Sequence, residues 1–202
     1  MNYNIIEQGL GIVILGTFTP LNFEVDNLVN IDVIKHEEEN QIIRIASNQD
    51  QTTFAVRNIR VMCDRYRLQV VTMDTVVIPR LIEFCRDVMN TMNVDSYRGV
   101  GINTHLKIRI TEDGDLDIFK QRLLPQQAAW QPISGNGHFE NVSVRNGNKT
   151  IELLYKKEND YTFNVNYHHE TRNIGEIVNV VNDAQVSFDS EISDLNRFLS
   201  AL

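Results

Sequence analysis

The chain has 202 residues, of which 42% are hydrophobic and 23% charged, and its formal net charge is −8. This composition is that of an ordinary globular protein, and it excludes the disordered, collagenous and membrane-spanning classes. A chain of this length buries enough surface to fold without a disulfide or a structural metal. Proteins that contact phosphates usually carry a basic face, so the absence of any basic run disfavours nucleic-acid binding.

The N-terminal stretch lacks the features of an export signal. No Lys or Arg precedes the apolar run at residues 12–15, and this run is too short for a signal core or a membrane span. Cys63 and Cys85 lack the close spacing of metal or redox pairs, so we expect two reduced, buried thiols. The sequence thus predicts a cytoplasmic protein without a cofactor.

The first half of the chain predicts a meander of strands followed by a helix. The expected strands lie in residues 4–16, 29–36, 41–47, 53–58, 60–64 and 66–72. Between them, the acidic run at residues 36–39 predicts a solvated hairpin tip. From Val77 to Met92 apolar residues recur every three or four positions, which predicts an amphipathic helix with Pro79 in its first turn and Asp74 or Thr75 as its cap.

The second half returns to strands and then to helix. The expected strands lie in residues 97–110, 139–144, 150–156 and 161–167. Residues 126–137 read as a loop, and Asn146-Gly147 predicts a hairpin turn. Apolar spacing from Ile177 to Leu202 predicts one long helix, or two with a break near Asp189, and Asn173 with Glu176 resembles a capping box.

The order of these elements indicates an internal duplication. Val56-Arg57-Asn58 precedes a strand, a Tyr-led strand and a helix, and Val144-Arg145-Asn146 precedes the same series. We therefore expect an α+β fold of two units, residues 1–95 and 96–202, each an antiparallel β-meander plus helix. The units would form one compact domain with the helices packed on one face of the sheet. The alternative is two unrelated meanders. Polar residues alternate onto the second face, which would meet water or a partner.

Two short motifs carry a resemblance to a known group of proteins. Thr17-Phe18-Thr19-Pro20 and Arg98-Gly99-Val100-Gly101-Ile102-Asn103 resemble segments of a sporadically distributed family of uncharacterised bacterial proteins with a duplicated meander and helix pattern. The sequence departs from that family after Asn103, where Thr104 and His105 follow. The resemblance implies the same fold, but it implies no activity because the family is uncharacterised.

The strongest candidate for chemistry is the run His168-His169-Glu170 at the end of an expected strand. Alternate strand residues share a face, so His168 and Glu170 could bind one metal ion, with His105 or His138 as a third ligand. His105 is also a candidate general base. The alternative for all of them is a polar strand surface.

Trp130 lies in the expected loop together with Gln127 and Gln131. Its side chain either packs into the hydrophobic core or anchors an interface with a protein partner. With no phosphate loop and no nucleophile tied to a histidine, we expect a non-catalytic interaction or assembly module. It would be an accessory subunit of a bacterial multi-gene system, such as a mobile element or a defence system, with a protein partner or a second copy of itself. The alternative is a metal-assisted hydrolase or nuclease that uses His168 and Glu170.

Overall fold

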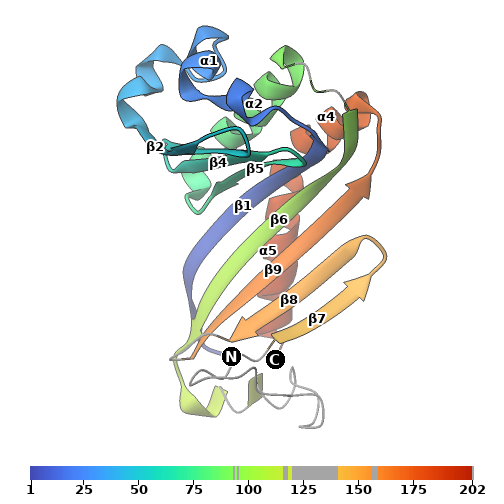
Figure 1. Cartoon of the computed structure of the whole chain (residues 1–202). Helices are drawn as coiled ribbons and strands as arrows, with labels where there is room; N and C mark the ends of the chain where they lie inside the picture. The colour runs from blue at the N-terminus through green and yellow to red at the C-terminus, as the bar shows by residue number, and fades with distance from the viewer. Residues whose placement is uncertain (93, 95, 116–117, 120–140, 156–158, 202) are drawn as a thin grey trace.

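The computed structural model describes residues 1–92, 94, 96–115, 118–119, 141–155 and 159–201. Within these residues the chain has an α+β fold, in which nine antiparallel strands form one sheet accompanied by helices (Figure 1). Strands of both expected units therefore belong to the same sheet.

The strands follow the order β2-β3-β4-β5-β1-β6-β9-β8-β7 across the sheet. Their bounds are β1 Tyr3–Thr17, β2 Ile42–Ser47, β3 Gln51–Val56, β4 Ile59–Asp64, β5 Arg67–Thr72, β6 Ser96–Ile110, β7 Asn141–Asn146, β8 Lys149–Tyr155 and β9 Asp160–Glu170. The expected strands at residues 41–47, 53–58, 60–64, 66–72, 97–110, 150–156 and 161–167 are confirmed to within a few residues where the structure describes them, and the strand expected at 139–144 is confirmed from residue 141 onward. The expected runs at the N-terminus form a single strand.

The centre of the sheet is the pair of 15-residue strands β1 and β6. They are paired from Tyr3 opposite Ile110 to Thr17 opposite Ser96, with two shifts in register. Figure 1 shows these strands side by side along the molecule, with β5 beyond β1 and β9 beyond β6.

The helices are α1 Val25–Asn30, α2 Ile78–Thr91, α4 Ile174–Asn182 and α5 Ala184–Ser200, and the 3-10 turns are η1 Pro20–Phe23, η2 His36–Gln41 and η3 Thr75–Val77. The expected helix at residues 77–92 is confirmed as α2, with Pro79 in its first turn. Asp74 accepts a hydrogen bond from the Val76 N–H and so caps the 3-10 turn before α2.

Strand and helix side chains meet in two hydrophobic clusters. The first joins Leu10, Ile12 and Ile14 of β1 to buried residues of α2 and α4. The second joins buried residues of β6 and β9 to Leu195 and Leu199 of α5. Figure 1 shows α5 passing behind β6 and β9.

The strand expected at residues 29–36 is wrong. The segment instead contains the end of α1, a turn and the start of η2. The Leu28 carbonyl accepts hydrogen bonds from the N–H groups of both Val33 and Ile34, and Asp32 has a φ of 58°. An extended strand cannot contain such a positive φ, so the apolar alternation there reflects a compact turn.

Three further expectations need correction. The acidic run is no solvated hairpin tip, because Glu38 is 1% exposed inside η2. The C-terminal helical region divides at Asp183 rather than near Asp189. Asn173 caps α4 as expected through the Gly175 N–H, but Glu176 accepts its hydrogen bond from the Thr171 hydroxyl, so the capping box is incomplete.

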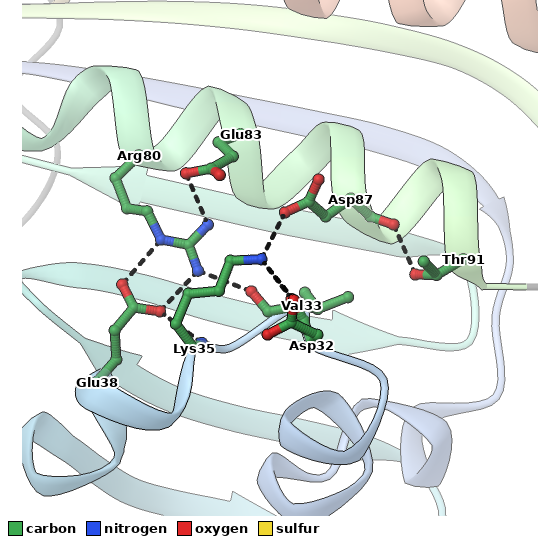
Figure 2. A network of polar contacts seen from close by, with 8 residues as sticks. All are labelled: Asp32, Val33, Lys35, Glu38, Arg80, Glu83, Asp87 and Thr91. Carbon is green, nitrogen blue, oxygen red and sulfur yellow. Dashed lines mark hydrogen bonds and ion pairs between the residues drawn. The ribbon is translucent and has the colours of Figure 1, made fainter.

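A buried ion pair fastens the segment before β2 to α2 (Figure 2). Arg80 donates from Nε to Glu38 Oε1 at 2.8 Å and from Nη2 to Glu38 Oε2 at 2.6 Å. The same Nη2 donates to the Val33 carbonyl at 2.7 Å, and the Lys35 N–H donates to Glu38 at 2.9 Å. Every oxygen of the buried carboxylate is thereby satisfied, as a buried charge requires.

The pKa of Glu38 reflects this environment. Burial by itself raises the pKa of the carboxyl, but hydrogen bonds from Arg80 and the Lys35 N–H, with the charges of Arg80 and Arg57, lower it below its ordinary value of 4.5. The folded protein thus favours the ionised carboxylate more than the unfolded chain does.

We predict that Arg80→Met destabilises the protein by about 3–5 kcal/mol, because Glu38 would remain buried without its partner. Chemical denaturation measures this change. The double variant Arg80→Met/Glu38→Leu should recover much of the loss, since no charge is then buried. As a control, Arg44→Met removes an exposed pair with Asp26 and should cost about 0–1 kcal/mol. A single variant no worse than this control would contradict the prediction.

The lowered pKa of Glu38 also predicts how stability depends on pH. The ionised Glu38 carboxylate contributes fully to the free energy of unfolding at pH values above its pKa in the unfolded chain. This contribution is lost as the pH falls below 4.5 and passes through the lower pKa that Glu38 has in the folded protein. The difference in the free energy of unfolding between the wild type and Glu38→Gln should therefore shrink as the solution is acidified below pH 4.5. A difference that grows on acidification would refute the assignment.

Candidate functional site

A hollow of about 440 Å³ lies over the middle of the sheet. Its lining residues belong to the adjacent strands β5, β1, β6 and β9, except for Met73, which directly follows β5. Within the described residues, one face of the sheet supplies the lining, apart from the core residue Leu10. We call this hollow the sheet hollow.

The strand ladders arrange the sheet hollow in rows that cross the four strands. Two central rows are Val71, Gly11, Asn103, Asn166 and Gln69, Val13, Gly101, His168. The flanking rows are Met73, Gly9, His105, Asn164 and Arg67, Leu15, Gly99, Glu170, and in the second of these Gly99 and Glu170 lie at the edge, next to the lining. Rows lie two residues apart, so four rows extend for about 20 Å along the strands.

Side chains of the opposite parity point into the core. Leu10, Ile12 and Ile14 of β1 and Val100 and Ile102 of β6 are all buried in the first cluster. Alternation therefore separates an apolar set, which contacts the helices, from the mixed set that lines the sheet hollow.

Glycines form much of the floor of the sheet hollow. A Cβ at Gly9 would lie 2.5 Å from the Thr72 carbonyl oxygen, and one at Gly99 would lie 2.5 Å from the His169 carbonyl oxygen, so packing requires glycine at both positions. A Cβ at Gly101 would meet nothing closer than 3.8 Å, and one at Gly11 would make ordinary contact with Val71 at 3.4 Å. The packing of the fold leaves room for a side chain at Gly11 and Gly101.

Amide and imidazole groups line the β6 and β9 side of the sheet hollow. Asn166 Nδ2 donates to Asn103 Oδ1 at 2.7 Å, and His105 Nδ1 lies 2.9 Å from Asn164 Oδ1. On β5, the Gln69 amide has no hydrogen-bond partner among the described residues. These groups keep donors and acceptors for a ligand. Apolar side chains come instead from β1 and β5, at Val13, Leu15, Val71 and Met73.

The charges around the sheet hollow are paired at its ends. Arg67 Nε donates to Asp64 Oδ2 at 2.8 Å. Beyond the row of His105, the same sheet face carries Asp160, which is 6% exposed and accepts bonds from Arg109 and Lys107. The hydrogen bond from Arg109, followed by that from Lys107, lowers the pKa of Asp160 although burial opposes this.

The structure places His105 and His168 on the same sheet face but does not bring them together. His105 lies opposite Asn164, four residues from His168 along β9, so their Cα atoms are about 14 Å apart. Ligand nitrogens must lie about 2 Å from a shared metal ion. Glu170 shares the face of His168, but among the described residues no group of three His, Cys, Asp or Glu side chains could hold a metal.

The interface residues Trp130, Gln127 and Gln131, and the alternative ligand His138, lie outside the described residues. Both cysteines are free and buried, as expected. Burial, with a smaller effect of the Asp64 charge, raises the pKa of Cys63 to about 12, and burial also raises the pKa of Cys85. Thiols in this state are poor nucleophiles.

Sequence reasoning missed the importance of Gly11, Gly101, Gln69, Asn103 and Asn164. The signal was available in part, because Gly11 and Asn103 have the parity opposite to the buried Ile12 and Ile102. What the sequence lacked was the register that brings β5, β1, β6 and β9 together.

The two kinds of floor glycine predict opposite effects on stability. Gly99→Ala should destabilise the protein by about 1–3 kcal/mol, because the new Cβ collides with a backbone oxygen. Gly101→Ala, two residues along the same strand, should leave stability unchanged or raise it by about 0.5–1 kcal/mol, because alanine loses less entropy on folding. Urea denaturation compares the two, and equal losses would show that Gly101 is also a packing requirement.

Among the described helices, none combines the length and apolarity needed to cross a membrane. Comparison of the sequence with protein-family models and with curated proteins finds no match. Function therefore rests on the geometry of the sheet hollow.

Proposed function

We propose that this chain is a non-catalytic interaction module, an accessory subunit that binds a protein partner through the sheet hollow. One observation carries the proposal. Half-buried to exposed amides with unused hydrogen-bonding groups, together with apolar side chains, surround glycines that the packing does not require. Glycine inside a strand often marks a place where a ligand or another backbone approaches closely.

The chemistry of the lining favours binding over catalysis. Nucleophilic catalysis needs a hydroxyl, thiol, amine or carboxylate held beside a base. Among the described residues, the lining of the sheet hollow contains no Ser, Thr, Cys, Tyr, Lys, Asp or Glu. His105 Nδ1 lies 2.9 Å from the Asn164 amide oxygen, and the carboxylate beside its Nε2 is Glu7, at 3.9 Å and outside the lining.

The shape of the sheet hollow favours a macromolecule over a small ligand. Small-molecule sites are concave and bury about 70–90% of the ligand surface. As far as the chain is described, strands of one sheet and Met73 bound the sheet hollow, so it offers a shallow, extended surface. Nucleic acid is a poorer candidate, because the described residues of the lining include one Arg, no Lys and no Phe, Tyr or Trp ring on which a base could stack.

The sheet face that carries the sheet hollow is explained by duplication of one strand-and-helix unit. In this account the helices of both copies lie on the opposite face of the sheet. Outward from the centre, β1-β5-β4-β3 mirrors β6-β9-β8-β7, which supports this view. Both outer hairpins have two-residue turns, at Arg57-Asn58 and Gly147-Asn148. The sequence match of Val56-Arg57-Asn58 to Val144-Arg145-Asn146 is therefore displaced by two residues.

Alternate residues along the central strands belong either to the core clusters or to the sheet hollow. This alternation supports the placement of all the helices on one face of the sheet. Apart from Leu10, the residues that line the sheet hollow belong to neither core cluster. The helices would then cover one face and leave the other to a partner.

A second copy of the chain is a less favoured partner. Edge strand β2 exposes Ile43 and Ile45, which are 65% and 53% exposed. However, the register of β2 with β3 shifts at Ile45, and a bulge in an edge strand opposes pairing with another strand. The sheet hollow has no such obstacle.

The test compares two exposed asparagines, Asn166 in the sheet hollow and Asn179 on α4. The tagged chain is expressed together with the genes that flank its own gene, and proteins retained on it are identified and quantified. We expect a flanking-gene product to bind the wild type and Asn179→Glu, and to be lost from Asn166→Glu. No such product, or equal retention by both variants, would overturn the proposal.

A further inference from the structure

The glycine floor of the sheet hollow indicates what kind of group it receives. At Gly101 a Cβ would have its nearest neighbours at 3.8–4.0 Å, and at Gly11 the two nearest would lie at 3.4 and 3.5 Å. Alanine thus fits both positions, and a strand gains stability from it. Because Gly11 and Gly101 have no side chain, the hollow is deeper over the middle of β1 and β6 by about the height of one side chain. Another backbone can therefore approach the sheet closely there.

The hydrogen-bonding groups around this floor match those of a peptide backbone. Each peptide unit offers one donor and one acceptor, and a primary amide offers both in return. Gln69 on one side and Asn103, Asn164 and Asn166 on the other present such amides along the sheet hollow. The 20 Å length estimated from four rows corresponds to about six residues of extended chain. Val13, Leu15, Val71 and Met73 supply apolar contacts for alternate side chains.

Charge indicates the character of that chain. The protein carries a net charge of −8, with 27 acidic residues, yet in the part of the chain that the structure describes no carboxylate lines the sheet hollow. Its ionisable side chains are Arg67, His105 and His168. Arg67 bonds Asp64 through Nε, which leaves other guanidinium donors for an acceptor. Three carboxylates stand at the edges: Glu7 beside His105, Asp64 paired with Arg67, and Glu170 two residues beyond His168 on the same face of β9. An acidic partner therefore meets a locally favourable surface on a protein that otherwise repels it.

We infer that the sheet hollow receives an extended, acidic segment of a partner polypeptide, whose backbone lies over Gly11 and Gly101 while its carboxylates face Arg67 and the two histidines. This inference rests on the proposed function and adds the conformation and charge of the bound segment. It differs from docking of a folded domain, which would not need the depth that the glycines provide.

Two fluorescein-labelled nonapeptides test the inference by fluorescence anisotropy with the full-length chain. One alternates valine and glutamate, and the other has lysine in place of glutamate. We expect the glutamate peptide to bind at least about tenfold more tightly than the lysine peptide. Higher salt should weaken its binding.

Variants separate the contributions of depth and charge. Gly101→Ala should lower the affinity for the glutamate peptide by about tenfold without loss of protein stability, because the new Cβ occupies space that the peptide backbone would use. Asn166→Lys should tighten its binding and Arg67→Gln should weaken it. Gly114→Ala serves as the matched control, since a Cβ there meets nothing within 4 Å and the residue lies outside the sheet hollow. It should bind as the wild type does.

Three outcomes would overturn the inference: neither peptide binds, the lysine peptide binds better, or Gly101→Ala binds as well as the wild type. Loss of a flanking-gene product from Asn166→Glu, combined with no peptide binding, would leave the proposed function standing and refute the extended segment alone. Self-association that Asn166→Glu abolishes would identify a second copy as the occupant and would also refute it.

Discussion

The ladder between β1 and β6 is the constraint on which the rest of the structure depends. It joins the first and second halves of the chain over nearly the whole length of both strands. Its register decides which residues of each strand face the clusters with α2, α4 and α5 and which line the sheet hollow. A slip of one residue would exchange the two sets, moving Ile12 out of the core and Gly11 into it.

That exchange would be costly, and this explains why the register is well defined. Leu10, Ile12 and Ile14 are at most 1% exposed, and each buried aliphatic side chain contributes roughly 1.5–3 kcal/mol. The opposite set contains Gly9, Gly11 and Val13, which could not replace that burial. The buried set therefore fixes the register that shapes the sheet hollow.

Local sequence patterns were enough to predict most strands and the helix α2, because alternation and three-to-four spacing reflect contacts with one face of the core. They failed at residues 29–36, where apolar alternation arises from a turn around Asp32 with positive φ. They also failed at Glu38, because its partner Arg80 is 42 residues away and only tertiary structure joins them. His105 and His168 were correctly placed in strands, but their separation depends on a register that no local pattern contains.

The floor glycines show how stability and function can be told apart in one strand. Gly99 and Gly101 lie on the same face of β6, two residues apart, and only at Gly99 does the backbone of β9 forbid a side chain. Packing therefore explains Gly99 completely and leaves Gly101 unexplained. A residue that weakens a strand without relieving any contact is expected at a site where something outside the fold occupies the space. The same reasoning applies to Gly11 on β1. The two positions lie in adjacent rows on the central strand pair, so one bound backbone running along the strands would cover both.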